Sequence, residues 1–189
     1  GTIFFRFNFV MNVDQCEFNA GDVLVQVKPR FSDGSVSLLA GEIGPFEAGM
    51  PCTIPLWLAI DLRRRHKCEI IPPEWLTLDW LKEHIVNEGE STGLAPLPHS
   101  FFEIAHLLTR FAKEDLTEGD KMKTLVQDIW DKREAKLRTS MLSFLSQSEL
   151  GHARIDSVQR LELATMRIPI LQSCQHLDRL ISNHHSFDN

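Results

Sequence analysis

The sequence predicts an α+β protein that is mainly α-helical, with a small N-terminal β-rich domain followed by a helical bundle domain of about five helices. Valines alternate with polar residues over Asp22–Lys28, which is the period of a half-buried strand. After Thr53 the apolar spacing changes to the helical period, and the longest helical patterns lie beyond a polar loop at 88–98. The expected division is a non-native extension at 1–10, a β-rich domain at 11–54, a helical domain at 55–183 and a polar tail at 184–189.

Composition places the chain among ordinary globular proteins, because 43% of its 189 residues are hydrophobic and 24% are charged. The four cysteines include no C-x-x-C pair, which favours a reducing compartment. The net charge of -6 argues against bulk attraction to nucleic acid or anionic lipid. No apolar run approaches the roughly 20 residues that a membrane-spanning helix needs. We therefore expect no membrane association, and we expect any contact with DNA to be local or indirect.

The first ten residues, GTIFFRFNFV, contain four phenylalanines and little charge. Such a segment aggregates as an exposed strand, and Met11 is the more natural start of the protein. We interpret 1–10 as a non-native extension; the alternative is an N-terminal docking strand.

The β-rich domain begins with a strand-like pattern that extends from Met11 to about Phe46. Ser32–Gly34 is expected to form a hairpin turn that leads into a second strand at Val36. Glycines at 41–49 suggest a phosphate-binding loop, but Met-Pro follows them where a Walker loop has Lys-Ser or Lys-Thr. These glycines therefore predict backbone turns.

Two helices are expected in the next part of the chain. Pro55 suits the first turn of a helix that ends in the basic run 63–67, and a short extended piece follows at 68–71. The second helix covers about 78–87.

Three further helices are expected beyond the loop. Ser100 predicts an N-cap, with Glu103 completing a capping box. Thr117 opens a long helix over about 118–147, and a final helix begins near Pro169. The long helix carries apolar side chains over more than half of its circumference. A fully intramolecular core helix and a helix shared with another subunit explain this pattern equally well.

The sequence predicts neither a catalytic nor a metal site, and it implies no cofactor. The eight histidines are scattered, and His184 and His185 lie in the polar tail without the spacing of a helical ligand pair. Cys52 is interpreted as a small buried residue rather than a nucleophile. Most carboxylates fall on the surfaces of predicted helices. Two basic runs are candidate docking surfaces for a partner or for phosphate, although solvated helix faces explain both runs more simply. Their cations are Arg63, Arg64 and Arg65 in the first run and Lys132, Arg133, Lys136 and Arg138 in the second.

Four segments together resemble the Psf-two subunit family of the eukaryotic GINS complex. They are Ile43–Phe46, Pro55–Ile60, Ile71–Trp75 and Trp130–Arg138, and they occur in the order of that family. The resemblance covers essentially Met11–Ile181 and leaves out 1–10, the loop at 88–97 and the end of the chain.

The resemblance implies a nuclear, non-catalytic scaffold subunit of an assembly that also contains Sld-five, Psf-one and Psf-three type chains. That assembly joins the Mcm ring and the Cdc forty-five protein in the replicative DNA helicase, so ATP hydrolysis would occur in other chains. The resemblance also implies that Trp57 and Trp75 lie at the domain junction, and that Trp130 lies in the core or at a subunit seam. Candidate core or interface residues are Trp57, Trp75, Ile129, Trp130, Leu137, Met141 and Phe144. The alternative is a free-standing helical adaptor or nucleic-acid-binding module.

Overall fold

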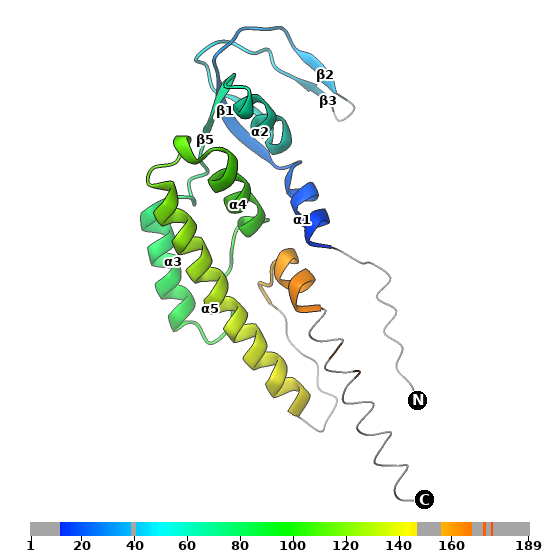
Figure 1. Cartoon of the computed structure of the whole chain (residues 1–189), viewed down its shortest axis with the longest axis vertical. Coiled ribbons are helices and arrows are strands. Elements are labelled where there is room, and N and C mark those ends of the chain that lie inside the picture. Colours follow the sequence, from blue (N-terminus) through cyan, green and yellow to red (C-terminus); the bar gives the residue numbers. More distant parts are fainter. Residues whose placement is uncertain (1–11, 39–40, 147–155, 168–171, 173–174, 176–189) are drawn as a thin grey trace, which may run out of the picture.

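The computed structural model describes residues 12–38, 41–146 and 156–167, together with Gln172 and Gln175. A part that contains the sheet lies at one end and a helical part lies at the other (Figure 1), which confirms the predicted α+β class. In chain order the elements are α1 (Val13–Ala20), β1 (Leu24–Pro29), β2 (Val36–Leu38), β3 (Gly41–Ile43), β4 (Cys52–Pro55), α2 (Leu56–Arg64), β5 (Cys68–Ile71), α3 (Leu78–Glu90), α4 (Phe101–Phe111), the short 3-10 helix η1 (Lys113–Asp115) and α5 (Gly119–Ser146). A further helical segment covers 160–167.

The three-stranded antiparallel sheet has the order β4-β1-β5, with β1 in the centre. Alternation along β1 buries Val25 and Val27, as the sequence pattern predicts. The strand β5 follows α2 and occupies the second edge of β1, where Ile70 pairs with Val27. The sheet therefore ends at Ile71, and the predicted boundary of the β-rich domain at 54–55 is wrong because it cuts this sheet.

The strands β2 and β3 form a separate two-stranded hairpin that projects from the sheet (Figure 1). The predicted hairpin between β1 and β2 is wrong, because β4 and β5 occupy both edges of β1. The expected glycine turns are present, and Gly44 has a φ of 108°. A Cβ atom on Gly44 would lie 3.1 Å from the Cα atom of Ser35, so a side chain there would be strained as well as crowded.

The helix α1 replaces the beginning of the predicted strand-like region. Asn12 and Gln15 form a capping box, in which the Asn12 backbone N–H donates to Gln15 Oε1 at 3.1 Å. The helix buries Cys16 and Ala20 and packs against α4. This capping pattern outweighs the strand-like composition of the residues around it.

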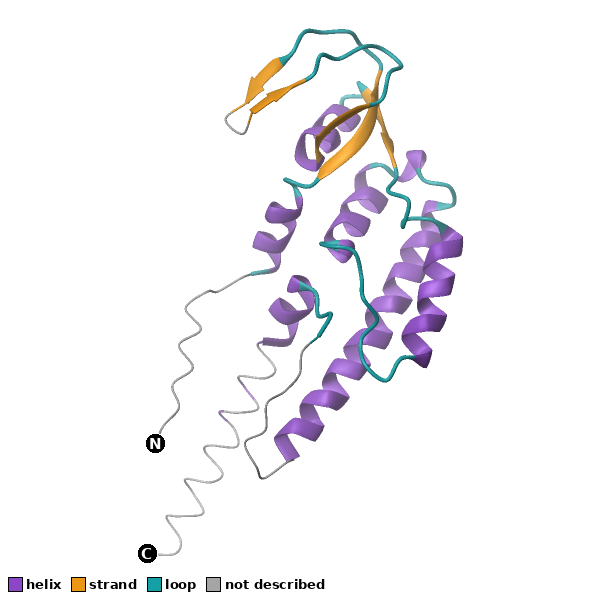
Figure 2. Ribbon diagram, turned by 180° about the vertical axis from the view of Figure 1, so that it is seen from behind, coloured by secondary structure: helices purple, strands orange, loops and turns teal. Residues whose placement is uncertain are grey.

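In the helical part, α3 packs along α5, and α4 lies between these helices and the sheet-containing part (Figure 2). The first turns of α4 bury Phe101, Phe102 and Ala105 in the main core. The predicted Ser100 capping box is wrong: Ser100 has a left-handed φ of 53° and makes no side-chain cap. Glu103 lies at the buried surface of α4 instead.

The predicted long helix over about 118–147 is confirmed, because α5 begins at Gly119 and ends at Ser146. The final helix predicted near Pro169, the extension at 1–10 and the polar tail at 184–189 lie outside the described residues, apart from Gln172 and Gln175. None of the helices within the described ranges is both long enough and apolar enough to cross a membrane.

Candidate subunit interface

The helix α5 supplies most of the side chains that the sequence assigns to the core or an interface. Ile129 is fully buried, whereas Trp130 is half-buried and meets the Phe102 ring edge-on at a centroid distance of 4.8 Å. This side of α5 is therefore intramolecular core.

The C-terminal half of α5 is less covered. Leu137 and Met141 are half-buried, and Leu137 lines a shallow depression with Thr165 and Met166 of the segment 160–167. Leu142 is 64% exposed. Phe144 lies on α5, but its side chain is outside the described part of the chain. The intramolecular explanation thus fits the side of α5 that carries Ile129 and Trp130, and an interface at its C-terminal half stays a prediction.

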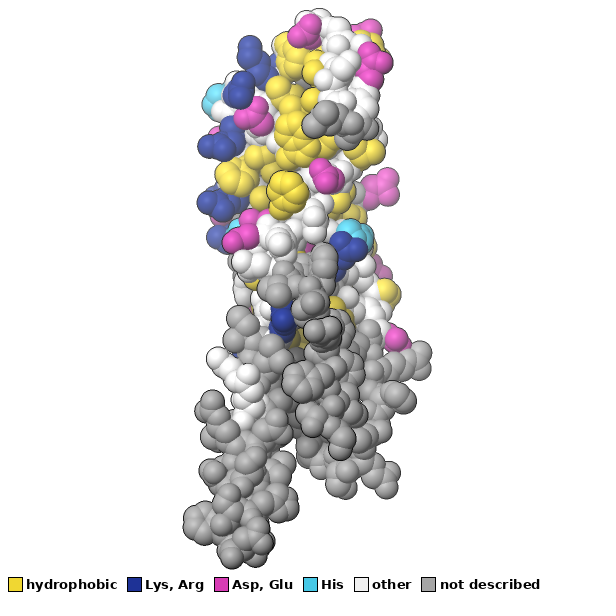
Figure 3. Space-filling model, turned by 90° about the vertical axis from the view of Figure 1, so that its right-hand side faces the viewer, with side chains coloured by type: hydrophobic (Ala, Val, Ile, Leu, Met, Phe, Trp, Pro, Cys, Tyr) yellow, Lys and Arg dark blue, Asp and Glu magenta, His cyan; other side chains and the backbone are white. Residues whose placement is uncertain are grey.

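The two junction tryptophans have different environments. Trp75 lies between β5 and α3, and its ring is 5.0 Å from Phe101 and 6.5 Å from Trp80. It thereby connects the end of the sheet to the helical core. Trp57, in the first turn of α2, is 46% exposed. Figure 3 shows apolar side chains gathered on the face seen from the side where α1 and α2 lie in Figure 1, with Lys and Arg side chains along one margin.

The first basic run contains one buried cation. Arg63 is 6% exposed, and its Nε–H donates to Asp115 Oδ2 at 2.7 Å. The same carboxylate oxygen accepts the backbone N–H of Ile70 at 2.9 Å, while Arg63 Nη2 donates to Glu114 at 2.8 Å. The hydrogen bond that Arg63 donates to the Asp115 carboxylate raises the pKa of Arg63. Arg63 thus joins α2, β5 and η1 through buried hydrogen bonds, and we call such a residue a fastener. It is not the exposed docking residue that the sequence suggested.

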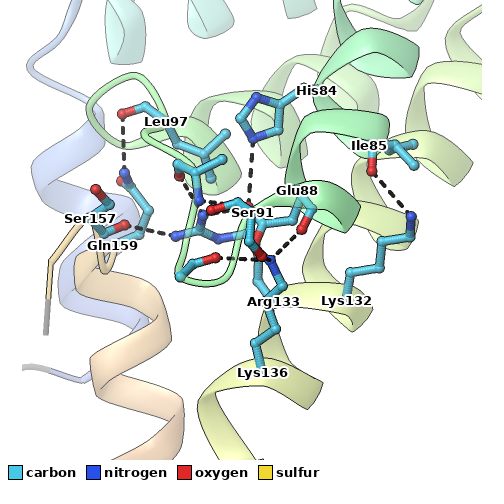
Figure 4. Close-up of polar contacts among 12 residues, drawn as sticks. His84, Ile85, Glu88, Ser91, Leu97, Lys132, Arg133, Lys136, Ser157 and Gln159 are labelled. Atoms are coloured by element: carbon cyan, nitrogen blue, oxygen red, sulfur yellow. Dashed lines mark hydrogen bonds and ion pairs between the residues drawn. The ribbon is translucent and has the colours of Figure 1, made fainter. Parts of the chain in front are cut away.

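The second basic run contains a more deeply buried cation. Arg133 is fully buried and uses all five of its N–H donors (Figure 4). Its Nε and Nη2 atoms donate to Glu162 at 2.7 and 3.0 Å, and Nη1 donates to Glu88 at 3.0 Å. The remaining donors reach the carbonyl oxygens of Ala95 and Ser157 at 2.7 and 2.8 Å. Burial lowers the pKa of Arg133, but the hydrogen bonds and charges of Glu162 and Glu88 outweigh that effect and raise it.

Lys136 completes this group, which we call the Arg133 cluster: Arg133, Lys136, Glu88 and Glu162. Lys136 Nζ donates to Glu88 Oε1 at 2.9 Å and to the carbonyl oxygens of Ser91 and Gly93 at 2.9 and 2.8 Å. Two cations thus face two carboxylates, which makes their burial tolerable. The cluster joins α3, the loop after it, α5 and the segment 156–167 (Figure 4).

The other cations of the two runs lie at the surface. Arg65 and Arg138 each pair with a carboxylate one helical turn earlier on their own helix, and Arg64 lies over the ring of Phe111. Lys132 is exposed and donates to the carbonyl oxygen of Ile85 at 3.1 Å. The interpretation as a solvated helix face therefore fits part of each run. The prediction that Arg133 lies at the surface is wrong, because Arg133 is buried in ion pairs with Glu88 and Glu162.

Sequence reasoning missed the buried carboxylates. Glu88, Glu103 and Glu162 are at most 3% exposed, although Glu88 was expected in a polar loop, Glu103 in a capping box and most carboxylates on helix surfaces. His84, four residues before Glu88, stacks on Trp80, and burial lowers its pKa. The i, i+4 spacing of His84 and Glu88 was the one local signal that could have indicated a polar side of α3 turned inward.

The described residues offer little for catalysis. They contain no group of three His, Cys, Asp or Glu side chains that could hold a metal ion. Burial raises the pKa of the Cys68 thiol to about 11, which suppresses the nucleophilic thiolate. The main features of these residues are exposed apolar side chains and the buried ion pairs of Arg63 and Arg133.

The fold and two family matches define the class of the protein. The model described as "PSF2 N-terminal domain" matches residues 12–71, and the "GINS complex protein helical bundle domain" matches residues 75–171. The first match ends with β5, as the sheet does. The molecule is therefore a two-part chain of the GINS class.

Curated relatives narrow this class. "Probable DNA replication complex GINS protein PSF2" of Caenorhabditis elegans is 47% identical over 176 residues, which cover 93% of this chain and 97% of the relative. "DNA replication complex GINS protein PSF2" of Homo sapiens is 37% identical, covering 92% and 94% of the two chains. The Drosophila melanogaster relative is 35% identical, covering 86% and 80%. The chain belongs to the PSF2 family of DNA replication complex subunits, which confirms the resemblance seen in its sequence.

Proposed function

We propose that this chain is a non-catalytic scaffold subunit of a four-chain GINS complex, with Sld-five, Psf-one and Psf-three type chains as its sisters. The observation that carries this proposal is the pair of family matches, which cover both parts of the chain in the family's order. Relatives that carry the GINS name match over nearly their whole length, so the assembly role can be transferred to the chain as a whole.

The scaffold role accounts for the distribution of apolar surface. Side chains such as Phe18, Leu24 and Leu142 are 64–78% exposed, and water contact with such side chains is unfavourable in an isolated chain. Burial against sister subunits would remove that cost. The ion pairs of Arg63 would keep the two parts of the chain in one arrangement, and those of Arg133 would hold the helical part together, while the chain supports its neighbours.

In the wider assembly, the GINS complex would join the Mcm ring and the Cdc forty-five protein in the nucleus, and ATP hydrolysis would occur in the ring. This step rests on the family resemblance, and the chain would contribute surfaces rather than chemistry to it.

Co-expression with the three sister subunits of the same organism tests the assembly role. Light scattering should give the mass of one copy of each chain, and the chain expressed alone should self-associate. A monodisperse, cooperatively unfolding monomer that forms no mixed species would contradict the proposal. Purification of the tagged chain from nuclear extract should also recover the Mcm subunits and Cdc forty-five, and recovery of the sister subunits alone would exclude the helicase role.

A further inference from the structure

One face of the sheet-containing part carries an apolar patch, which consists of Phe18, Leu24 and Trp57. Their exposed fractions are 78%, 65% and 46%. The elements that carry them adjoin, because Trp57 N–H donates to the carbonyl oxygen of Gly21 at 3.0 Å and Leu24 pairs with Pro55, two residues before Trp57. Three adjoining elements, α1, β1 and α2, thus each present a large exposed apolar side chain.

A basic patch consists of exposed cations from α2, α4 and the connections that follow β1 and α2, namely Arg30, Arg64, Arg65, Lys67 and Arg110. The guanidinium carbons of Arg64 and Arg110 lie 5.7 and 5.0 Å from the centroid of the same Phe111 ring. Arg30 N–H donates to the carbonyl oxygen of Lys67 at 2.8 Å, which holds these two residues side by side.

Most of this positive charge is not neutralised within the described ranges. Arg65 pairs with Asp61 at 3.0 Å, and Glu114 is bonded to Arg63. No salt bridge involves Arg64, Lys67 or Arg110 in the part of the chain that the structure describes. A basic patch of this kind stands out in a chain whose net charge is -6.

The two patches adjoin. Trp57 and Arg64 are seven residues apart on α2, so they lie on one face of that helix, two turns apart. Figure 3 shows the same arrangement, with apolar side chains bordered by Lys and Arg. An apolar centre with an arginine-rich margin is the usual composition of a protein-binding surface.

We propose that this face binds an amphipathic helix of a protein partner, whose apolar stripe covers Phe18, Leu24 and Trp57 and whose carboxylates meet Arg64 and Arg110. A phosphate backbone would neutralise the basic patch but would leave the apolar patch in water, whereas a helix satisfies both. The inference rests on the proposed function, since the partner belongs to the replication assembly, and it adds the chemistry of the segment that this face accepts.

Photo-cross-linking tests the inference in the assembled protein. Benzoylphenylalanine replaces Trp57 in the co-expressed four-subunit complex, which is irradiated alone and in nuclear extract, and the cross-linked peptide is sequenced by mass spectrometry. The peptide should have apolar residues at helical spacing, with Asp or Glu beside them. Arg64→Glu with Arg110→Glu should reduce the yield about tenfold, because it reverses the charge at the contact.

The matched control is Lys82→Glu with Lys123→Glu, which makes the same charge change on exposed residues of α3 and α5 and should leave the yield within about twofold. No cross-link in either sample, a peptide without carboxylates, or a yield that the Arg64 and Arg110 changes leave intact would overturn the inference. Light scattering of the same samples reports four-subunit assembly separately, so failure of the proposed function is distinguishable.

Nucleic acid is the competing occupant. Fluorescence anisotropy with a labelled thymidine oligonucleotide of about 20 residues measures it directly. The two double variants should bind this probe equally. A selective loss of binding in Arg64→Glu with Arg110→Glu would assign the basic patch to nucleic acid and would refute the helix-binding proposal.

Discussion

The basic runs at 63–67 and 132–138 have similar compositions, but the structure uses them differently. In the first run only Arg63 turns inward, and it connects the sheet-containing part to η1. In the second run Arg133 and Lys136 both contact Glu88, and together they connect four segments of the helical part. The comparison teaches that a cation in a basic run is buried where carboxylates from other segments meet it.

The two fasteners also differ in their access to water. Glu114, one of the two partners of Arg63, has an 83% exposed side chain, so water can replace part of that interaction. Both carboxylate partners of Arg133 are at most 3% exposed. Removing the cation therefore leaves an unpaired buried charge in the second case and a partly hydrated one in the first.

The largest effect is expected at Arg133. Arg133→Met should lower the free energy of unfolding by about 3–5 kcal/mol, because the buried Glu162 loses its cation and the buried Glu88 keeps only Lys136. Urea unfolding of the co-expressed complex measures this loss. Arg138→Met is the control, and its exposed ion pair with Glu134 should contribute only about 0–1 kcal/mol. Equal stability of the two variants would contradict the role of the cluster.

A smaller effect is expected at Arg63. Arg63→Met should cost about 2–3 kcal/mol, because it removes charge-assisted hydrogen bonds to Asp115 and Glu114. Hydrogen exchange at the Ile70 amide should accelerate, since that N–H donates to the released Asp115 carboxylate. Arg65→Met is the control: it breaks a surface ion pair with Asp61 and should leave the Ile70 amide protected. Equal hydrogen exchange at Ile70 in both variants would show that Arg63 does not hold the two parts of the chain together.

Lys136→Met should cost about 1–2 kcal/mol and should act locally. The variant frees the carbonyl oxygens of Ser91 and Gly93, so hydrogen exchange should rise over 91–95 and stay unchanged in α4. Lys132→Met, one turn earlier on α5, provides the comparison, because the hydrogen bond of Lys132 goes to the Ile85 carbonyl of α3 and not to the loop at 91–95. A loop that is equally protected in both variants would argue against Lys136 as its anchor.

The smallest effect tests whether a buried carboxylate without a cation behaves differently from those in the Arg133 cluster. Burial raises the pKa of Glu103 above its ordinary value of 4.5, and Oε2 has no hydrogen-bond partner among the described residues. Because the folded state favours the protonated form, stability should fall as the pH rises through the raised pKa. Glu103→Gln should therefore be more stable than the wild type at pH 7, by about 1 kcal/mol, with no advantage below pH 4.5.

Thermal unfolding of the wild type and Glu103→Gln across this pH range measures the effect. The exposed Glu83 offers a control, and Glu83→Gln should follow the wild type at every pH. A constant difference between Glu103→Gln and the wild type would mean that packing, rather than ionisation, sets the stability at this position.

The sequence predicts the elements whose signals are local. The alternation in β1, Pro55 before α2 and the long apolar period of α5 all have counterparts in the structure. The α1 capping box was also local, but the strand-like residues around it concealed it. Strand register and the burial of charged side chains cannot be predicted from local signals. Arg133 pairs with carboxylates 29 and 45 residues away, which no short stretch of sequence contains. The same holds for β5, whose partner strand lies on the far side of α2.

The attachment of α5 has a mechanical consequence. The helix has 28 residues and is thus about 42 Å long. At its upper end, η1 approaches so closely that a Cβ atom on Gly119 would lie 3.1 Å from Lys113 Cγ, and η1 is itself fastened to the sheet through Asp115. Halfway along, Arg133 clamps α5 to α3. The helix is therefore held at its start and at its middle, and the C-terminal half that carries the exposed Leu142 extends beyond both attachments.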